Sequence, residues 1–260
     1  MSARTVLTIA YDGAPYHGWQ VQKNAPSVQK TLQEAICAIT GEERTVTGCS
    51  RTDAGVHALE YVCHTEKIDI PNERLPQALN AHLPPSVSVK RARTADENFH
   101  ARYSCIGKEY LYKIYNSRIR DPFSVGRALF YPEPIDVEAL SFVSEELCGT
   151  HDFRAFMAQG SKIVDTVRTV RHCTLSRNGD FVYLTVSADG FLYNMVRIMA
   201  GTLYETAIGH IPPDSIPERL ASRNRRLMGR TAPPEGLYLN RVFYDDGEIP
   251  GYHGGTCHGN

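Results

Sequence analysis

Residues 48–58 hold the side chains of this chain that are best placed to do chemistry. The segment contains one carboxylate, Asp53, with Arg51 two residues before it and the glycines Gly48 and Gly55 on either side. A carboxylate in such a loop can act as a nucleophile or as a general base, and a neighbouring guanidinium favours its ionised form. The same residues also fit an ordinary type I turn in which the aspartate side chain forms a hydrogen bond with its own backbone. The rest of the chain has to decide between these two interpretations.

The composition is that of an ordinary globular protein. Of 260 residues, 42% are hydrophobic and 22% are charged, which excludes disordered and fibrous classes. The length suits one large domain or two small ones. Because 28 Lys+Arg balance 29 Asp+Glu, nucleic-acid binding would need basic residues gathered on one face. Two groups are candidates, although runs of arginine are more often solvated surface: Arg102, Lys108, Arg118, Arg120 and Arg127, and then Arg219, Arg223, Arg225, Arg226 and Arg230.

The seven cysteines are scattered and form no C-x-x-C pair. This pattern is typical of reduced thiols in a cytoplasmic protein, and not of a disulfide framework or a zinc site. His253, Cys257 and His258 could ligate a metal, but they lack a fourth ligand nearby and are expected to belong to a frayed tail. Residues 6–10 are too short for a signal peptide, and no apolar run approaches a membrane span. We therefore expect a cytoplasmic protein with no metal and no membrane segment.

Hydrophobic periodicity divides the chain into two similar halves. In the first half, strands are expected at residues 5–11, 44–50, 61–67 and 87–94. One helix is capped by Ser27 and ends at Thr40-Gly41, and a second opens at Asn72 and stops before Pro84-Pro85. This β-α-β-β-α-β order is that of the ferredoxin-like (RRM-like) unit. Residues 48–58 then form the connection between its second and third strands.

The pattern restarts beyond residue 104. Strands are expected at residues 108–116, 168–177, 181–188 and 237–244, with Asn178-Gly179 as a hairpin turn. Helices are expected at residues 137–147, 191–207 and 216–223. We therefore predict an α+β protein with two ferredoxin-like halves, residues 1–104 and 105–260. Their largely antiparallel sheets would lie side by side and leave a central cleft.

Two residues outside the segment 48–58 leave alternatives open. Trp19, the only tryptophan, lies in a polar loop where it could stack on a ligand or close the edge of a core. Arg197 lies at the edge of the apolar stripe of the helix expected at 191–207. It could extend to water, as such arginines commonly do, or stay half-buried and pair with a carboxylate from the facing half.

Several short motifs follow one another along the chain. They are Tyr11-Asp12-Gly13, Gly18-Trp19-Gln20, Ser27-Val28-Gln29, residues 51–58 (RTDAGVHA), Phe99-His100-Ala101-Arg102, Lys108-Glu109-Tyr110, residues 191–197 (FLYNMVR) and residues 232–237 (APPEGL). In this order they resemble the bacterial tRNA pseudouridine synthase A family, from Tyr11 to about Tyr244. Residues 51–58 are the most specific of them.

The resemblance implies a cofactor-free isomerase that converts uridine to pseudouridine at positions 38 to 40 of the tRNA anticodon arm. It also implies a homodimer with one tRNA lying across both subunits. Asp53 would be the catalytic residue, Tyr110 the aromatic that stacks on the flipped uracil, and Arg197 the partner of Asp53. Arg51 matches a family residue implicated in holding RNA near the site. One departure is Leu59-Glu60-Tyr61, where the family commonly has Gly-Gln, and an acidic Glu60 puts the usual RNA contacts there in doubt.

The residues make chemical sense of this reaction. The N1–C1′ bond has to break, the base has to turn, and C5 has to join C1′. A carboxylate can serve by attacking C1′ or C6, or by abstracting a proton to start glycal formation, so one aspartate suffices. Arg197 and Arg51 would keep Asp53 ionised, and the target uridine would have to be extruded from its helix. Either Tyr110 or a water could take the C5 proton at the end.

Two other function classes remain alternatives. A non-catalytic RNA-binding module could use two RRM-like sheets, although no RNP1-type aromatic pattern occurs. A small-molecule enzyme on the same scaffold would be expected to carry a Gly-rich phosphate loop or a metal-binding carboxylate cluster, and the sequence has neither. The ordered motifs favour the isomerase.

Overall fold

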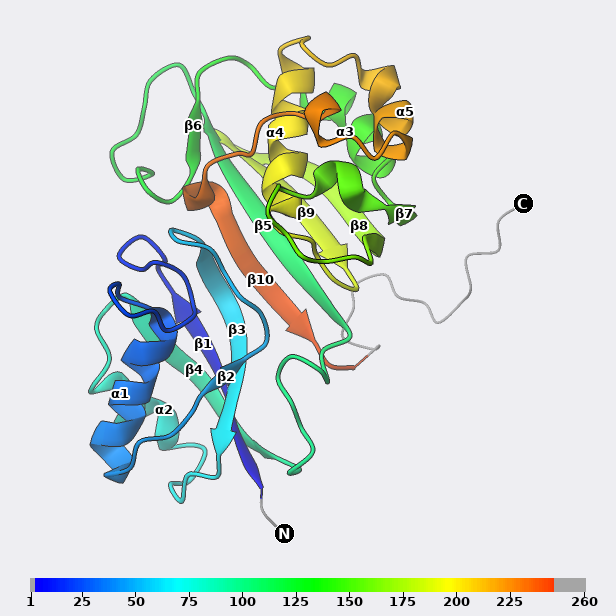
Figure 1. Ribbon diagram of the computed structural model, residues 1–260. Helices are drawn as coiled ribbons and strands as arrows, with labels where there is room; N and C mark the ends of the chain where they lie inside the picture. Colours follow the sequence, from blue (N-terminus) through cyan, green and yellow to red (C-terminus); the bar gives the residue numbers. More distant parts are fainter. Residues whose placement is uncertain (1–2, 246–260) are drawn as a thin grey trace.

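In the part of the chain that the structure describes, one sheet of ten strands extends through both halves (Figure 1). The structure is a computed structural model that describes residues 3–245, so His253, Cys257 and His258 lie outside the described residues. The strand order is β4-β1-β3-β10-β5-β9-β8-β7, with β2 paired to β3 and β6 paired to β5. Most neighbouring strands are antiparallel and the helices are few, which confirms the α+β class.

The first half of the chain forms one end of this sheet. Its elements are β1 (Arg4–Tyr11), α1 (Val28–Thr40), β2 (Thr47–Gly48), β3 (His57–Glu66), α2 (Leu75–Asn80) and β4 (Val87–Ala95). Strand β1 lies between β3 and β4 and is antiparallel to both. Helix α1 has the ends that its sequence predicts, because the Ser27 side chain accepts the Lys30 N–H and Gly41 closes the helix in a left-handed conformation.

The second half forms the other end of the sheet. Its strands are β5 (Gly107–Asn116), β6 (Leu129–Tyr131), β7 (Gly149–Asp152), β8 (Val167–Asn178), β9 (Phe181–Ala188) and β10 (Leu237–Phe243). Its helices are α3 (Val137–Glu145), α4 (Met195–Ala207) and α5 (Ile216–Ala221), which gather around this end of the sheet (Figure 1). The hairpin between β8 and β9 turns at Gly179, as Asn178-Gly179 predicts.

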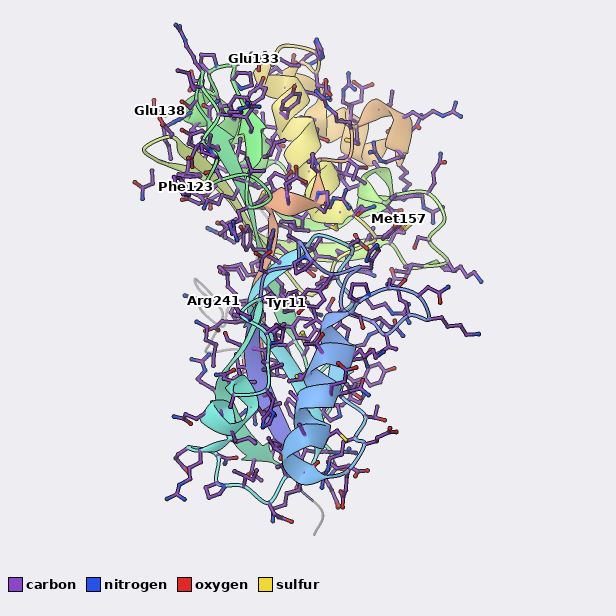
Figure 2. All side chains as sticks on the ribbon, turned by 90° about the vertical axis from the view of Figure 1, so that its left-hand side faces the viewer. Tyr11, Phe123, Glu133, Glu138, Met157 and Arg241 are labelled. Atoms are coloured by element: carbon purple, nitrogen blue, oxygen red, sulfur yellow. The ribbon has the colours of Figure 1, made fainter. Side chains whose placement is uncertain are left out.

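The two halves join where the last strand enters the middle of the sheet. Strand β10 is antiparallel to β5 and parallel to β3, with Tyr238 opposite His57 and Leu239 opposite Ala58. Tyr11 and Arg241 lie near this level in the side view (Figure 2). The two sheets expected side by side are therefore one continuous sheet.

Several boundaries differ from the sequence prediction. The strand expected at 44–50 pairs only over β2, whereas β3 begins at His57, four residues before the expected start. Helix α2 is shorter than the predicted span from Asn72. Helix α4 begins at Met195 instead of residue 191, and the short strands β6 and β7 were not predicted. Because α4 starts late, residues 191–194 lie outside the helix, where they line a cavity.

Candidate active site

The connection between β2 and β3 carries Asp53 and is held by the segment that follows β1. The Tyr11 hydroxyl and Thr52 Oγ1 are hydrogen-bonded at 2.9 Å. The backbone N–H of Trp19 donates to the Thr52 carbonyl at 3.2 Å, and the backbone N–H of Gly13 donates to His57 Nδ1 at 3.0 Å. The backbone on both sides of Asp53 is thus fixed to a neighbouring loop.

Two glycines make this contact possible. A Cβ on Gly13 would lie 2.1 Å from the carbonyl oxygen of Val56, and a Cβ on Gly18 would lie 2.2 Å from that of Thr52. Gly18 also has φ +88°, which L-residues rarely adopt. The motifs Tyr11-Asp12-Gly13 and Gly18-Trp19 therefore support the Asp53 loop. Trp19 itself is buried and stacks on Tyr61 with ring centroids 4.2 Å apart, so it closes a core.

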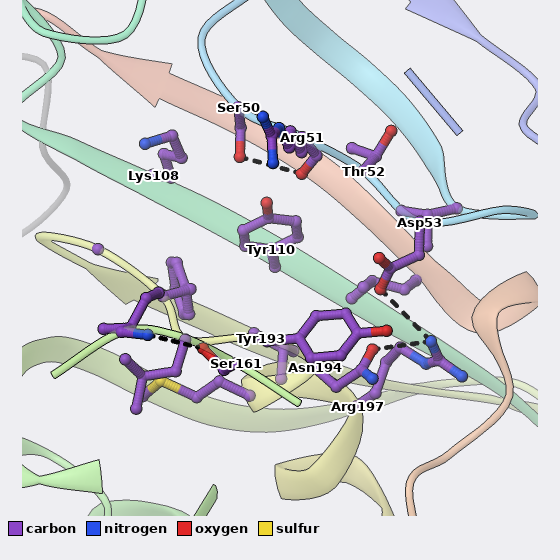
Figure 3. A pocket seen from close by; sticks show the side chains of 18 of the residues that line it. Ser50, Arg51, Thr52, Asp53, Lys108, Tyr110, Ser161, Tyr193, Asn194 and Arg197 are labelled. Carbon is purple, nitrogen blue, oxygen red and sulfur yellow. Dashed lines mark hydrogen bonds and ion pairs between the residues drawn. The ribbon is translucent and has the colours of Figure 1, made fainter. Parts of the chain in front are cut away.

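The turn at Asp53 is not the type I turn that the sequence suggested. The Val56 N–H donates to the Asp53 carbonyl, so the turn spans 53–56, and its third residue, Gly55, has φ +79°. A positive φ at this position is a feature of type II turns. The Asp53 side chain points across the cavity to Arg197 and not back to its own turn (Figure 3).

Asp53 and Arg197 form an ion pair between the two halves. Arg197 Nη1 lies 3.5 Å from Asp53 Oδ2, and the two side chains are 15% and 39% exposed. The guanidinium is aimed by two further contacts, since its Nε donates to the Ala232 carbonyl at 2.7 Å and Nη1 donates to Asn194 Oδ1 at 2.8 Å. Arg197 is therefore the half-buried partner of a carboxylate and not a solvated arginine.

Asn194 explains both the late start of α4 and the position of Arg197. Its φ of +60° is left-handed, a conformation that asparagine tolerates better than most residues. The helix cannot extend backwards through such a residue. Asn194 at the N-cap is also three residues before Arg197, so its amide oxygen reaches the guanidinium along the first turn.

The electrostatic environment of Asp53 combines two opposing effects. Burial raises the pKa of the Asp53 carboxyl above its ordinary 3.8, and the charge and hydrogen bond of Arg197 lower it without cancelling the rise. Arg51, which we expected to help keep this carboxylate ionised, is exposed and does not contribute to this shift. The role of Arg51 therefore stays a prediction, and its side chain lies along the cavity wall.

Tyr110 lies on β5 beside the Asp53 loop (Figure 3). Its ring is 7% exposed and meets Phe191 edge to face, with centroids 4.9 Å apart and planes at 82°. Burial holds the pKa of its hydroxyl well above the ordinary value, so the phenol is neutral at physiological pH. The ring is thus a fixed, uncharged surface in the wall of the cavity.

A cavity of about 870 Å³ opens between the two halves and brings these side chains together. Asp53 is the single carboxylate among its lining residues, and six cations surround it: Arg51, Arg102, Lys108, Lys162, Arg168 and Arg197. Each cation can neutralise part of a phosphate's charge. The cavity therefore suits an anionic ligand larger than a single phosphate, with one carboxylate available to react.

Several lining residues were not identified from the sequence. Gly160, Ser161, Lys162 and Ile163 reach the cavity from the loop between the short helix Phe153–Phe156 and β8. The only signal for this loop is a Gly-Ser-Lys run without periodicity, which indicates a loop but not its position. The sequence likewise gave no indication that Lys108 and Arg168 would line the same cavity as Asp53.

The second group of arginines does not form a basic surface of this kind. Arg223 pairs with Asp152 at 2.9 Å and Arg230 with Glu205 at 3.1 Å. Arg225 donates to the Gly229 carbonyl at 2.8 Å. These arginines mainly hold α5 and the segment after it in place.

Glu60 does not interfere with the cavity. Its carboxylate pairs with Arg91 Nη2 at 2.9 Å, and it is not among the lining residues. Within residues 3–245, no cluster of three or more histidine, cysteine, aspartate or glutamate side chains could hold a metal ion. None of the helices described has the length and apolar character needed to cross a membrane.

Comparison with known proteins agrees with this geometry. Residues 7–104 and 143–245 match a family model described as tRNA pseudouridine synthase. The chain belongs to this family. Proteins called tRNA pseudouridine synthase A are 45% identical in Thermoanaerobacter sp. (strain X514), over 92% of this chain and 98% of the relative, and 40% identical in Bacillus subtilis, over 94% and 100%. The Acetivibrio thermocellus relative is 46% identical over 92% and 98%.

The parts of the chain that match the tRNA pseudouridine synthase family model include every residue that lines the cavity except Lys108 and Tyr110. Asp53 and Arg51 lie in the first matched part, and Arg197 lies in the second. Tyr110 lies between the two matched parts. A chain of a Cbf5-Nop10-Gar1 complex superposes with TM-score 0.37 and 10% identity over 76% of this chain and 53% of that one, which is too weak to bear on the fold.

Proposed function

We propose that this protein isomerises uridine to pseudouridine in the anticodon stem-loop of tRNA, at positions 38 to 40, with Asp53 as the catalytic residue. The observation that carries the proposal is the ion pair of Asp53 with Arg197 in a cavity where six cations surround this one carboxylate. RNA brings many phosphates to a site, and such a cavity can bind them without reading sequence. Membership of the family supports the same reaction.

The chemistry needs little beyond this carboxylate. Breaking the N1–C1′ bond and forming the C5–C1′ bond leaves the formula unchanged, with the proton lost from C5 balanced by one gained at N1. No electron leaves or enters the substrate, so no redox cofactor is called for. Attack at C1′, attack at C6 and proton abstraction all require Asp53 in its ionised form, which Arg197 favours.

Tyr110 gives the extruded base a surface to stack on. Flipping a nucleotide out of a stem costs a few kcal/mol, and stacking on an aromatic side chain returns about 1–3 kcal/mol. The cavity volume of about 870 Å³ is within the usual range for ligand sites. Burial keeps the Tyr110 hydroxyl protonated, so the residue presents a neutral ring to the base, and either this hydroxyl or a water takes the C5 proton.

We also propose that the two halves are ferredoxin-like units divided near residue 104. The strand orders β4-β1-β3-β2 and β10-β5-β9-β8 support this, since both run fourth, first, third, second once the short strands β6 and β7 of the second half are left out. Cytoplasmic tRNA is the proposed substrate, and the six described cysteines are free thiols, as a reducing compartment would leave them.

A homodimer is proposed as well. Exposed Ile119, Phe123 and Val125 offer apolar contact surface between β5 and β6, and Figure 2 shows where Phe123 lies. Light scattering tests for the homodimer.

The decisive experiment measures pseudouridine in unmodified tRNA treated with the pure protein in EDTA, by carbodiimide-probed primer extension. We expect pseudouridine in the anticodon arm with the native protein and none with Asp53→Ala or Asp53→Asn. Both variants should still bind tRNA, because the six cations remain. Binding without any product from the native protein would favour an RNA-binding module instead. Product from the Asp53 variants would remove Asp53 as the catalyst.

A further inference from the structure

A second groove adjoins the cavity on the side of the first half. The groove encloses about 240 Å³. Its lining comes from three parts of the chain: residues 19–20 with Gln29, residues 45–51 without Cys49, and residues 100–103 without Ala101. Ser50, Arg51 and Arg102 line both this groove and the cavity around Asp53. The two spaces are therefore neighbours separated by this shared wall, and a ligand longer than one nucleotide can reach over the wall from one into the other.

Tyr103 presents an aromatic ring at this groove. The residue is 78% exposed, although large apolar rings are usually at least partly covered. One side of the ring stacks on His100, with centroids 4.3 Å apart and planes at 30°. The Arg102 guanidinium lies 5.9 Å from its centroid. Because Tyr103 is still 78% exposed beside these two neighbours, its ring has open surface for another flat partner.

The backbone beneath Tyr103 is fixed by a closed set of hydrogen bonds. His100 Nδ1 accepts the N–H of Arg102 at 3.1 Å and that of Tyr103 at 3.2 Å. Ser104 closes the turn, because its N–H donates to the His100 carbonyl at 2.8 Å and its Oγ accepts the His100 N–H at 3.0 Å. The exposed ring is thus held in one place by a rigid turn.

The same turn is anchored to the sheet. Ala101 is fully buried, and its N–H donates to His64 Nδ1 on β3 at 3.1 Å. Burial, with smaller effects of His100 and Arg4, lowers the pKa of His64 to about 4. At neutral pH the His64 imidazole is therefore uncharged and keeps Nδ1 free to accept this hydrogen bond. A binding partner at Tyr103 would not have to order the loop first, which favours affinity.

We propose that this groove is a second nucleotide subsite. A base next to the flipped uridine stacks on Tyr103, and the phosphate between the two nucleotides lies against Arg51 and Arg102. The inference rests on the proposed function, because it requires RNA in the cavity. An RNA strand that passes from the cavity to the groove has to bring a phosphate across the shared wall. The exposed guanidiniums of Arg51 and Arg102 lie at this wall. Stacking tolerates any base, so Tyr103 secures the flanking nucleotide without selecting its sequence.

The test compares Tyr103→Ala and Tyr103→Phe with the native protein in binding an anticodon stem-loop RNA. Loss of one stacked base should weaken Kd by about 5- to 150-fold in Tyr103→Ala. Tyr103→Phe keeps the ring and should stay near the native Kd. Phe142→Ala is the matched control, because Phe142 is also an exposed aromatic, 56% exposed, but lies on α3. Thermal unfolding followed by circular dichroism verifies that all variants are folded.

A set of abasic RNAs separates stacking from a structural effect. One base flanking the target uridine is removed at a time, and Kd is measured for the native protein and for Tyr103→Ala. At one flanking position, removal of the base should weaken RNA binding to the native protein. Removal of the same base should not weaken RNA binding to Tyr103→Ala. Native affinity in Tyr103→Ala, or an equal loss with every abasic RNA, would overturn the subsite. If the native protein neither binds RNA nor forms pseudouridine, the proposed function itself fails.

Discussion

Asp53 and Arg197 come from opposite halves of the chain, and Arg197 modifies the acidity of Asp53. Burial raises the pKa of Asp53, while Arg197 limits the rise. The carboxylate is therefore less well solvated than a surface aspartate, while Arg197 favours its ionised form. This combination suits a nucleophile or base that has to react without being shielded by water.

The pH dependence of Asp53 follows from this balance. The folded-state pKa of Asp53 lies above 3.8. The rate of uridine modification should therefore fall as the pH is lowered, with its midpoint at a higher pH than the pKa of a free aspartate. Arg197→Met removes the effect that lowers the pKa, so the midpoint should rise further. Carbon-13 carboxyl NMR titration, assigned with Asp53→Asn, measures both values without requiring activity.

The control for this titration is Glu60→Gln, which removes a carboxylate paired with Arg91 on the sheet. It should leave the Asp53 midpoint unchanged. An Asp53 midpoint at or below 3.8 in the native protein, or one that Arg197→Met does not move, would contradict the assignment of burial and Arg197 as the opposing causes.

At this scale the sequence identified Asp53, Tyr110 and Arg197 through their motifs, and the structure places all three at one cavity. It did not identify Asn194 or Lys162. Asn194 acts through a left-handed backbone angle, and an asparagine that adopts it cannot be distinguished in sequence from one that does not. Lys162 lies on a loop whose position depends on the sheet beneath it.

Among the elements, the connection between β2 and β3 depends most on its neighbours. It has little regular structure of its own, and its shape comes from the segment 11–19, which packs glycine backbone directly on it. Periodicity predicted strands around this connection but misplaced their ends by up to four residues. Those ends are set by long-range contacts that leave no local pattern.

Gly18 tests this dependence. Gly18→Ala introduces a Cβ 2.2 Å from the Thr52 carbonyl and also strains φ +88°. We expect a loss of about 2–5 kcal/mol in unfolding free energy, combining left-handed strain with overpacking, and a large loss of modification. Urea unfolding and the pseudouridine assay measure the two effects.

Gly41→Ala is the matched control, because Gly41 has φ +75° but nothing within 4 Å of the added Cβ. It should cost only about 1–2 kcal/mol and leave modification intact. Equal effects of the two substitutions would mean that the close approach to Thr52 does not shape the site.

For the whole molecule, the parallel pairing of β10 with β3 makes the two halves one sheet. The sequence predicted the strands of each half but not this pairing, since periodicity shows that a strand exists and not which distant strand lies beside it. The Pro233-Pro234 segment leading into β10 adds to the connection. Tyr112 donates to the Pro233 carbonyl at 2.8 Å, and the side chain of Pro234 lies against Gly55.

The halves should consequently unfold together. Trp19, the only tryptophan, lies buried in the first half, so its fluorescence reports that half while far-UV circular dichroism reports the whole chain. We expect the two urea midpoints to coincide. Leu239→Ala, at a fully buried position of β10, should cost about 2–5 kcal/mol and lower both midpoints equally. A Trp19 transition that Leu239→Ala leaves in place would show that the halves unfold independently.

The position of β10 also sets an order of events during synthesis. This strand, at 237–243, is made after every other strand of the sheet, yet it occupies the middle of the finished sheet. On the ribosome, β3 and β5 emerge long before the strand that separates them, and Asp53 has no fixed distance to Arg197 until it arrives. A chain that terminates before β10 would carry both residues and still lack an assembled site, so β10 has to be made before the protein can act.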